Sequence, residues 1–146
     1  MLLHFFSLFL RALSHGPAAG EHLRAAETAF AIQSAVCDDD GECDEPRGAL
    51  LAVIAAEESR GAPGVRGDRG NSCGRWQLGV VARHGVTCDE LDADPYLDAR
   101  TAYAALLQFE EWCGSLEGAL RAYATGSCSR GVDYQRRRCA LAEACL

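Results

Sequence analysis

The sequence contains no lysine, so its 14 basic side chains are all arginines, against 21 acidic residues. The formal net charge is −7 and the pI is about 5.0. A chain with this excess of negative charge binds nucleic acid or an anionic membrane surface poorly unless it has a local basic patch. The charge balance therefore argues against a nucleic-acid-binding protein, and we expect no nucleic-acid partner.

Residues 1–13 form an apolar segment that is too short to span a bilayer as a helix, which takes about 20 residues. Its length suits the apolar core of a secretory signal and the small residues at 17–20 suit cleavage, although no Lys or Arg precedes the apolar core. We expect residues 1–20 to be a signal peptide, with an amphipathic helix docked on the domain as the alternative. Residues 21–146 would form the domain, which is not expected to insert stably into a membrane.

The sequence also has no C-x-x-C pair, and its four histidines show no metal-ligand spacing. Zinc and redox-motif interpretations are therefore weak, and we expect no metal or other cofactor. The eight cysteines instead favour disulfides formed in an oxidising compartment, which predicts a secreted or periplasmic protein. The shortest spacings suggest Cys37 with Cys43 and Cys139 with Cys145, and a bridge from Cys73 would brace the loop around it.

The segment 37–43 has four carboxylates around a glycine, which is reminiscent of a calcium loop. An EF-hand places its acidic ligands at alternate positions before the glycine and a Glu six residues after it, and this spacing is not present. We therefore expect a solvated turn pinned by a disulfide.

Strand-like alternation is missing except in the segment 61–78, which could form an irregular hairpin. With 146 residues, of which 49% are hydrophobic, the chain suits one domain with a real core, and we expect a monomer. Asp94 and Pro95 form a helix start signal, and Leu23 and Phe30 are apolar positions of a helix expected to pack on the central one. The expected helices cover 21–36, 50–58, 80–84, 96–113, 116–123 and 134–145.

The helix over 50–58 is the centre of the predicted fold. Residues 50–56 are apolar without a break, so more than one face of this helix would be buried. Glu57 and Glu58 follow, and helical spacing carries both carboxylates toward packed apolar surface. Such surroundings favour the protonated form of a carboxyl group, which can then act as a general acid. The alternative is an ordinary solvated pair of acidic residues.

A glycine-rich loop follows this helix. Its five glycines between 61 and 74, together with Pro63, prevent a continued helix and let the backbone approach another group closely. Polar side chains are set into the loop at Asp68, Arg69, Asn71, Ser72, Arg75 and Gln77.

The sequence resembles the active-site segment of the goose-type lysozymes and soluble lytic transglycosylases. The resemblance is carried by Glu58-Ser59, Gly67 to Ser72, Gly74 and Trp76-Gln77, and by Ala-Tyr-Ala-Thr-Gly at 122–126, where the family has Ala-Tyr-Asn-x-Gly. It covers about residues 47–135. It implies a mainly α, lysozyme-like domain with a buried central helix, a glycine-rich active-site loop and a substrate cleft over the Glu58 end. The cysteines add that the domain is disulfide-stabilised.

The resemblance also implies a reaction. In that family the Glu of the Glu-Ser pair is the catalytic acid, which selects Glu58 rather than Glu57. The expected activity is cleavage of peptidoglycan glycan strands between N-acetylmuramic acid and N-acetylglucosamine, with Glu58 as general acid and then base. Ser72, Gln77 and Tyr123 would orient the substrate or the acid.

Asp68 is the second catalytic candidate, because it is the only acidic residue between 59 and 81. Gly79 stands where goose-type enzymes carry another acidic residue. We expect Asp68 to pair with Arg66 or Arg69 as a structural residue. This favours a transglycosylase with one essential carboxylate over a lysozyme that uses Asp68 as its base.

Two functions from other classes stay open. A non-catalytic glycan-binding module would explain Gly79 and Ala124, but not a Glu at position 58 in an apolar setting. A disulfide-rich structural protein would explain the cysteines, but not the loop pattern over 67–77. The run Arg136 to Arg138 is expected to be a solvated helix face.

Overall fold

The computed structural model describes residues 1–13 and 15–145. This part of the chain is mainly helical, as expected, with seven helices, 63% of the residues helical and one two-stranded hairpin. No helix among the described residues has the length and apolar character needed to cross a membrane. The helices are α1 (Leu2–Ala12), α2 (Glu21–Val36), α3 (Glu45–Ser59), α4 (Cys88–Ala93), α5 (Pro95–Cys113), α6 (Leu116–Thr125) and α7 (Val132–Ala142).

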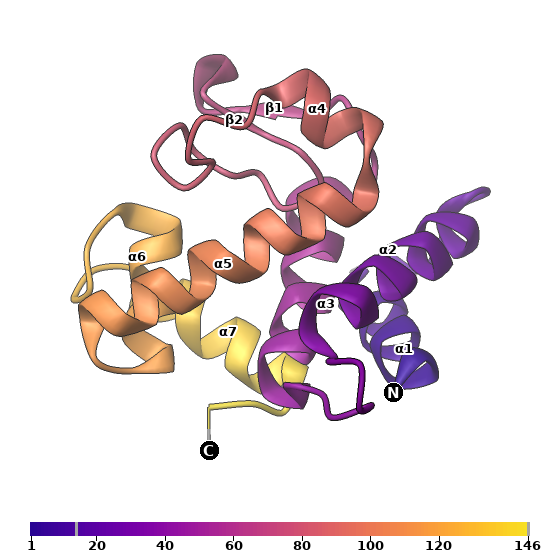
Figure 1. Cartoon of the computed structure of the whole chain (residues 1–146), viewed down its shortest axis with the longest axis horizontal. Coiled ribbons are helices and arrows are strands. Elements are labelled where there is room, and N and C mark those ends of the chain that lie inside the picture. Colours follow the sequence, from indigo (N-terminus) through magenta and orange to yellow (C-terminus); the bar gives the residue numbers. More distant parts are fainter. Residues whose placement is uncertain (14, 146) are drawn as a thin grey trace.

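Helix α3 is the centre of the fold, and it contacts α1, α2, α5 and α7 (Figure 1). Every residue from Leu50 to Ala55 is completely buried, as the unbroken apolar run predicts. The helix begins at Glu45 rather than Leu50, because the Asp44 side chain accepts a hydrogen bond from the backbone N–H of Arg47 and Pro46 occupies the first turn. At the other end, Arg60 is left-handed and stops the helix.

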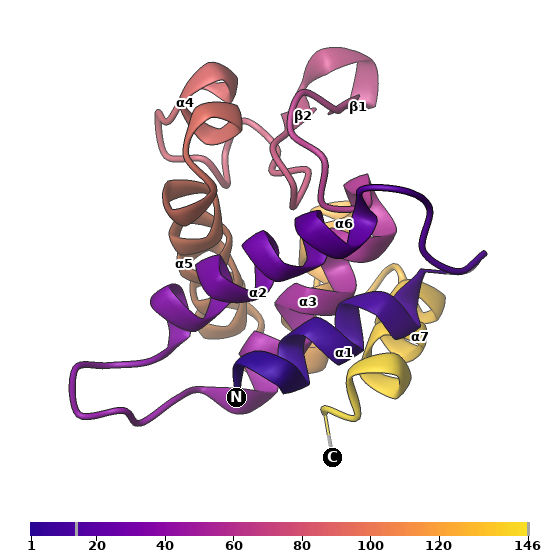
Figure 2. The ribbon, with the colours of Figure 1, turned by 90° about the vertical axis from the view of Figure 1, so that its right-hand side faces the viewer.

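Helices α1 and α2 lie side by side across α3 (Figure 2). Phe5 and Phe9 of α1 are completely buried, and the Phe5 ring fills the space beside Gly48. In α2 the expectation that Leu23 and Phe30 face the core is wrong, since they are 78% and 52% exposed. The inner face of α2 consists mostly of small residues, which let α2 approach α1 and α3 closely. Whether residues 1–20 are removed as a signal stays a prediction.

The loop after α3 contains the irregular hairpin that the sequence predicts. Strand β1 (Arg66–Gly67) pairs antiparallel with β2 (Ser72–Cys73), and a 3₁₀ turn at Asp68–Gly70 connects them. Figure 1 shows the hairpin and α4 together beyond the C-terminal end of α3.

Two helix predictions in the second half need correction. Residues 80–85 form turns rather than a helix, because the five expected residues are too few between Gly79 and Gly85. Helix α4 is absent from the helices expected from the sequence, although Thr87 and Glu90 form a capping box at its start. Helix α5 begins at Pro95 with Asp94 as its cap, as expected. Helix α7 ends at Ala142 rather than Cys145, because Glu143 is left-handed.

Four disulfides join all eight cysteines. The expected Cys37–Cys43 and Cys139–Cys145 pairs are confirmed, and Cys73 in the hairpin is bridged to Cys88 in α4. The turn at 37–43 is closed by its own hydrogen bonds, since Asp38 Oδ1 accepts from the backbone N–H groups of residues 40 and 42. Four disulfides are typical of a protein outside the cytoplasm.

Candidate active site

The candidate active site is a cavity at the C-terminal end of α3, between the hairpin, α6 and α7. Its volume is about 360 Å³. All five site residues selected from the sequence line it: Glu58, Asp68, Ser72, Gln77 and Tyr123. Gly67, Ala124, Tyr134 and Arg138 complete the lining. Segments far apart in the sequence therefore meet at Glu58.

A second cavity, of about 620 Å³, adjoins the first and shares five lining residues with it, among them Asp68 and Tyr123. Its other lining residues are Asn71, residues 78–82, Phe109, Ala122, Thr125 and Gly126. Phe109 meets Tyr123 edge to face, with the ring centroids 6.2 Å apart. We call the two cavities together the candidate groove. It has the concave, partly apolar and partly polar character of a ligand-binding cleft.

Glu58 is held by two donors from α7. Its Oε1 accepts a hydrogen bond from the Tyr134 hydroxyl at 3.0 Å and one from Arg138 Nη2 at 3.2 Å. The Glu58 side chain is 26% exposed, and no donor among the described residues bonds its Oε2. Burial, and next the negative charge of Glu58, raise the pKa of Tyr134 well above its usual value. The Tyr134 hydroxyl therefore keeps its proton and remains a donor.

Glu57 points to a different set of partners. It forms an ion pair with Arg137, and its Oε2 lies 3.2 Å from Arg138 Nη2. Its side chain is only 9% exposed, and it does not line the candidate groove. The helical spacing thus carries both carboxylates away from open solvent, as expected, but Glu58 alone faces the groove.

Tyr134 and Arg138 are the site residues that the sequence analysis missed. The expectation of a solvated face over Arg136 to Arg138 is wrong for Arg138, which is 8% exposed. Its guanidinium carbon lies 3.3 Å from the centroid of the Tyr134 ring, a stacked cation–π contact. Tyr134 and Arg138 are four residues apart and therefore share one helix face, which is the only signal for the pair in the sequence.

The polar groups of the loop mostly bond within the site. Ser72 Oγ donates to Asp68 Oδ2 at 2.6 Å. Gln77 Nε2 donates to the backbone carbonyls of Val65 and Gly74, and the Tyr123 hydroxyl donates to the carbonyl of Trp76. Burial raises the pKa of Tyr123 well above its usual value. These three side chains therefore fix the shape of the groove.

The environment of Asp68 differs from the expectation. Arg66 forms its ion pair with Asp92, at 2.7 Å, and neither Arg66 nor Arg69 pairs with Asp68. The predicted Arg–Asp68 pair is therefore wrong, because α4 places Asp92 closer to Arg66. Asp68 is exposed, with a left-handed backbone (φ 47°), and lines both cavities of the groove.

The loop is anchored to α3 by two buried hydrogen bonds. Trp76 is completely buried, and its Nε1 donates to the Leu51 carbonyl at 2.8 Å. Ser59 Oγ donates to the Arg75 carbonyl at 2.6 Å. A loop held at both points keeps a fixed position relative to the end of α3, where Glu58 lies.

A second anchor joins the loop to α5. Asp98 is completely buried, and its Oδ2 accepts a hydrogen bond from the backbone N–H of Arg75 at 2.7 Å. Burial raises the pKa of Asp98 to about 7, although the contacts with Arg75 act in the opposite direction. Gly74 packs directly on this carboxylate, since a Cβ there would lie 2.6 Å from Asp98 Oδ1. The Arg75 guanidinium also binds Glu27, at 2.8 Å.

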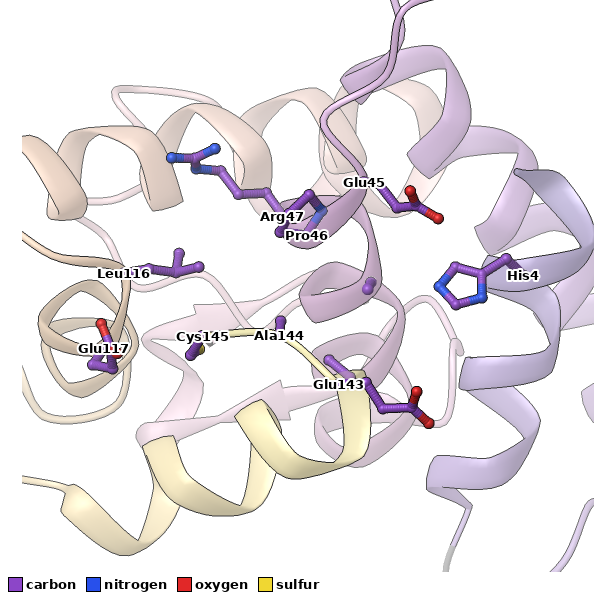
Figure 3. A pocket seen from close by; sticks show the side chains of 11 residues that line it. His4, Glu45, Pro46, Arg47, Leu116, Glu117, Glu143, Ala144 and Cys145 are labelled. Carbon is purple, nitrogen blue, oxygen red and sulfur yellow. The ribbon is translucent and has the colours of Figure 1, made fainter.

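Another cavity, of about 580 Å³, lies beside the first turn of α3, at the opposite end from Glu58 (Figure 3). It is lined by residues of α1, α3, α6, the end of α7 and the chain after it, with His4, Glu45 and Glu143 around it. No residue of the glycine-rich loop reaches it. Over residues 1–13 and 15–145, no group of three or more His, Cys, Asp or Glu side chains has an arrangement that could hold a metal ion.

Comparisons with known proteins give no match. A scan against models of protein families, a search of curated proteins and a search of solved structures all find no significant similarity.

Proposed function

We propose that this protein cleaves the glycan strands of peptidoglycan between N-acetylmuramic acid and N-acetylglucosamine, with Glu58 as the general acid and base, in a lysozyme-like domain. The observation that carries the proposal is the common cavity. Five residues chosen from the sequence for one chemistry line one 360 Å³ space, although they come from three separate segments.

The bonding of Glu58 suits a proton donor. Both donors from α7 meet Oε1, so the proton of the neutral acid belongs on Oε2, which no described residue bonds. Glu58 would give this proton to the glycosidic oxygen as the bond to the muramic acid carbon breaks, through an oxocarbenium-like transition state. The ionised carboxylate would then accept a proton from the incoming hydroxyl.

The identity of that hydroxyl separates a transglycosylase from a lysozyme. In a transglycosylase it belongs to the sugar itself and closes an anhydro ring, so no second carboxylate is needed. Asp68 is occupied on Oδ2 by Ser72 and lies in an exposed 3₁₀ turn, which supports a role in holding the loop. We therefore propose a transglycosylase, with Asp68 as the base of the alternative lysozyme reaction.

A second candidate function is a non-catalytic glycan-binding module. Ala124 lines both cavities without a polar side chain, and the polar groups of Ser72, Gln77 and Tyr123 bond within the protein. These features would suit a groove that holds a glycan without cleaving it. A purely structural role for the disulfide-rich domain would need no groove at all.

The three functions are separated by one experiment on purified sacculi. The proposed enzyme lowers the turbidity of the suspension and releases soluble fragments. A binding module sediments with the sacculi and leaves the turbidity unchanged, whereas a structural protein neither sediments with them nor clears them.

A further inference from the structure

One nitrogen of a buried arginine lies between two consecutive carboxylates. Arg138 Nη2 is 3.2 Å from Glu57 Oε2 and 3.2 Å from Glu58 Oε1. The Arg138 side chain is only 10% exposed, and its guanidinium stacks on the Tyr134 ring. The two carboxylates therefore share this guanidinium, and Arg137 is a second partner of Glu57 alone.

A general acid changes its charge during each turnover. A buried cation beside it therefore loses its counter-charge whenever the acid is protonated. If Glu58 were the only partner of Arg138, each protonation of Glu58 would leave a buried guanidinium without a counter-charge. An unpaired buried charge is strongly destabilising, so the arginine would move toward water. Such a movement would take away one of the two donors that orient Glu58.

Glu57 removes this problem, because it lies outside the groove and has no role in proton transfer. Its contact with Arg138 does not depend on the charge of Glu58, so Arg138 keeps a carboxylate partner in both charge states of Glu58. Tyr134 adds a second restraint, since its ring packs against the guanidinium while its hydroxyl bonds Glu58.

We propose that Arg138 is a positioning residue for Glu58 and that Glu57 is the permanent counter-charge that keeps Arg138 in place. This assignment rests on the proposed function, because it takes Glu58 to be the catalytic acid. It also accounts for the Glu-Glu pair at the end of α3: one carboxylate faces the substrate, and the other holds the arginine.

The test is a kinetic comparison on a soluble glycan substrate, with kcat and KM measured separately. Arg138→Met and Glu57→Gln should each lower kcat by about 10-fold to 10²-fold with little change in KM, because misplacing a catalytic group by an ångström has effects of this size. Arg138→Lys should recover part of kcat, since it keeps the charge but loses the flat stacked group.

Arg136→Met is the matched control, because Arg136 lies in the same run, is exposed and makes no ion pair among the described residues. Its kinetics should equal those of the wild type. Circular dichroism establishes that each variant is folded. If Arg138→Met does not fold, Glu57→Gln still tests the assignment, since it removes one charge without creating a cavity.

Normal kcat in folded Arg138→Met, or in Glu57→Gln, would overturn the assignment while the wild type stays active. A rise in KM without a change in kcat would instead make Arg138 a substrate-binding residue and also overturn it. Inactivity of the wild-type protein itself would be a failure of the proposed function, which this design separates from a failure of the inference.

Discussion

The Asp98 carboxylate accepts a 2.7 Å hydrogen bond from the backbone N–H of Arg75, which joins the glycine-rich loop to the inner face of α5. Arg75 directly precedes Trp76 and Gln77, so this contact acts together with the two hydrogen bonds to α3 in holding the part of the loop that borders the groove. Because Asp98 is completely buried and its pKa is raised to about 7, the contact is sensitive to pH near neutrality.

The pH dependence of stability follows from the direction of this shift. Between pH 4 and pH 7 folded Asp98 binds a proton that the unfolded chain does not, because its pKa is raised from 3.8 to about 7. Its contribution to the free energy of unfolding therefore falls as pH rises through this window, by on the order of a few kcal/mol at about 1.4 kcal/mol per pKa unit.

Urea unfolding of the wild type and Asp98→Asn at several pH values measures this contribution. The difference between the two proteins should change across the window, because the amide cannot titrate. A constant difference from pH 4 to pH 8 would show that Asp98 does not titrate there.

Replacing the proposed acid should abolish lysis. Glu58→Gln keeps the size of the side chain but removes the transferable proton, so clearance of sacculi should fall by at least about 10² to 10⁴-fold. The variant should unfold near the wild-type temperature and still sediment with sacculi. Retained lysis, or a larger loss in Glu57→Gln, would place the acid elsewhere.

The products should identify how the reaction ends. A transglycosylase leaves anhydro-muramic ends, which mass spectrometry distinguishes from the reducing ends left by a lysozyme. In the same assay Asp68→Asn should keep appreciable activity, because its amide oxygen can still accept the Ser72 bond. Reducing ends together with an inactive Asp68→Asn would make Asp68 the base of a lysozyme.

The substitution Gly48→Ala tests whether α1 belongs to the mature domain. A Cβ at Gly48 would lie 2.3 Å from the Phe5 ring, so Gly48→Ala should destabilise a chain that retains α1 by about 1 to 3 kcal/mol. Without α1 the same change should stabilise α3 by up to about 1 kcal/mol, since alanine is the better helix former. The intact mass of the secreted protein and its urea unfolding measure both.

Phe5→Ala provides the control for this prediction. In its background Gly48→Ala should lose its cost, because the clashing ring is gone, and the two changes should therefore be strongly non-additive. A secreted protein that begins near residue 21 would confirm the signal peptide and make both substitutions irrelevant to the mature fold.

The Cys73–Cys88 bridge should matter for both stability and activity. It closes a loop with a sequence separation of 15, and its removal by paired serine substitutions should cost about 3 kcal/mol. Lysis should fall as well, because β2 carries Ser72 beside the groove. Removing Cys37–Cys43, whose separation is 6 and which lines neither cavity of the groove, is the control and should leave lysis nearly unchanged. Thiol titration of the denatured wild type should find most of its cysteines unreactive.

Helix boundaries could be predicted where side chains encode them. Asp94 and Pro95 give the start of α5 correctly, and a similar signal, Asp44 followed by Pro46 one residue further on, marks the true start of α3. The apolar run alone misplaces that start at Leu50, because hydrophobic periodicity marks the buried part of a helix and not its exposed first turn.

Only some residues of the candidate site could be predicted from the sequence. Glu58 and the loop could be predicted together, because the loop follows α3 directly and Trp76 folds it back onto the helix. Arg138 could not, since it lies 80 residues from Glu58 and one sequence contains no information on such a pairing. A run of three arginines has the same pattern whether it is solvated or, as for Arg138, buried against two carboxylates.

The order of the disulfides has a consequence for biosynthesis. Each cysteine is joined to the next one along the chain, in the pairs 37–43, 73–88, 113–128 and 139–145. When such a chain crosses a membrane N-terminus first, the native partner of the first cysteine in each pair is always the next cysteine to emerge. Simple pairing in order of arrival then yields the complete native set. If this chain is exported, we therefore expect it to need a thiol oxidant but little help from a disulfide isomerase.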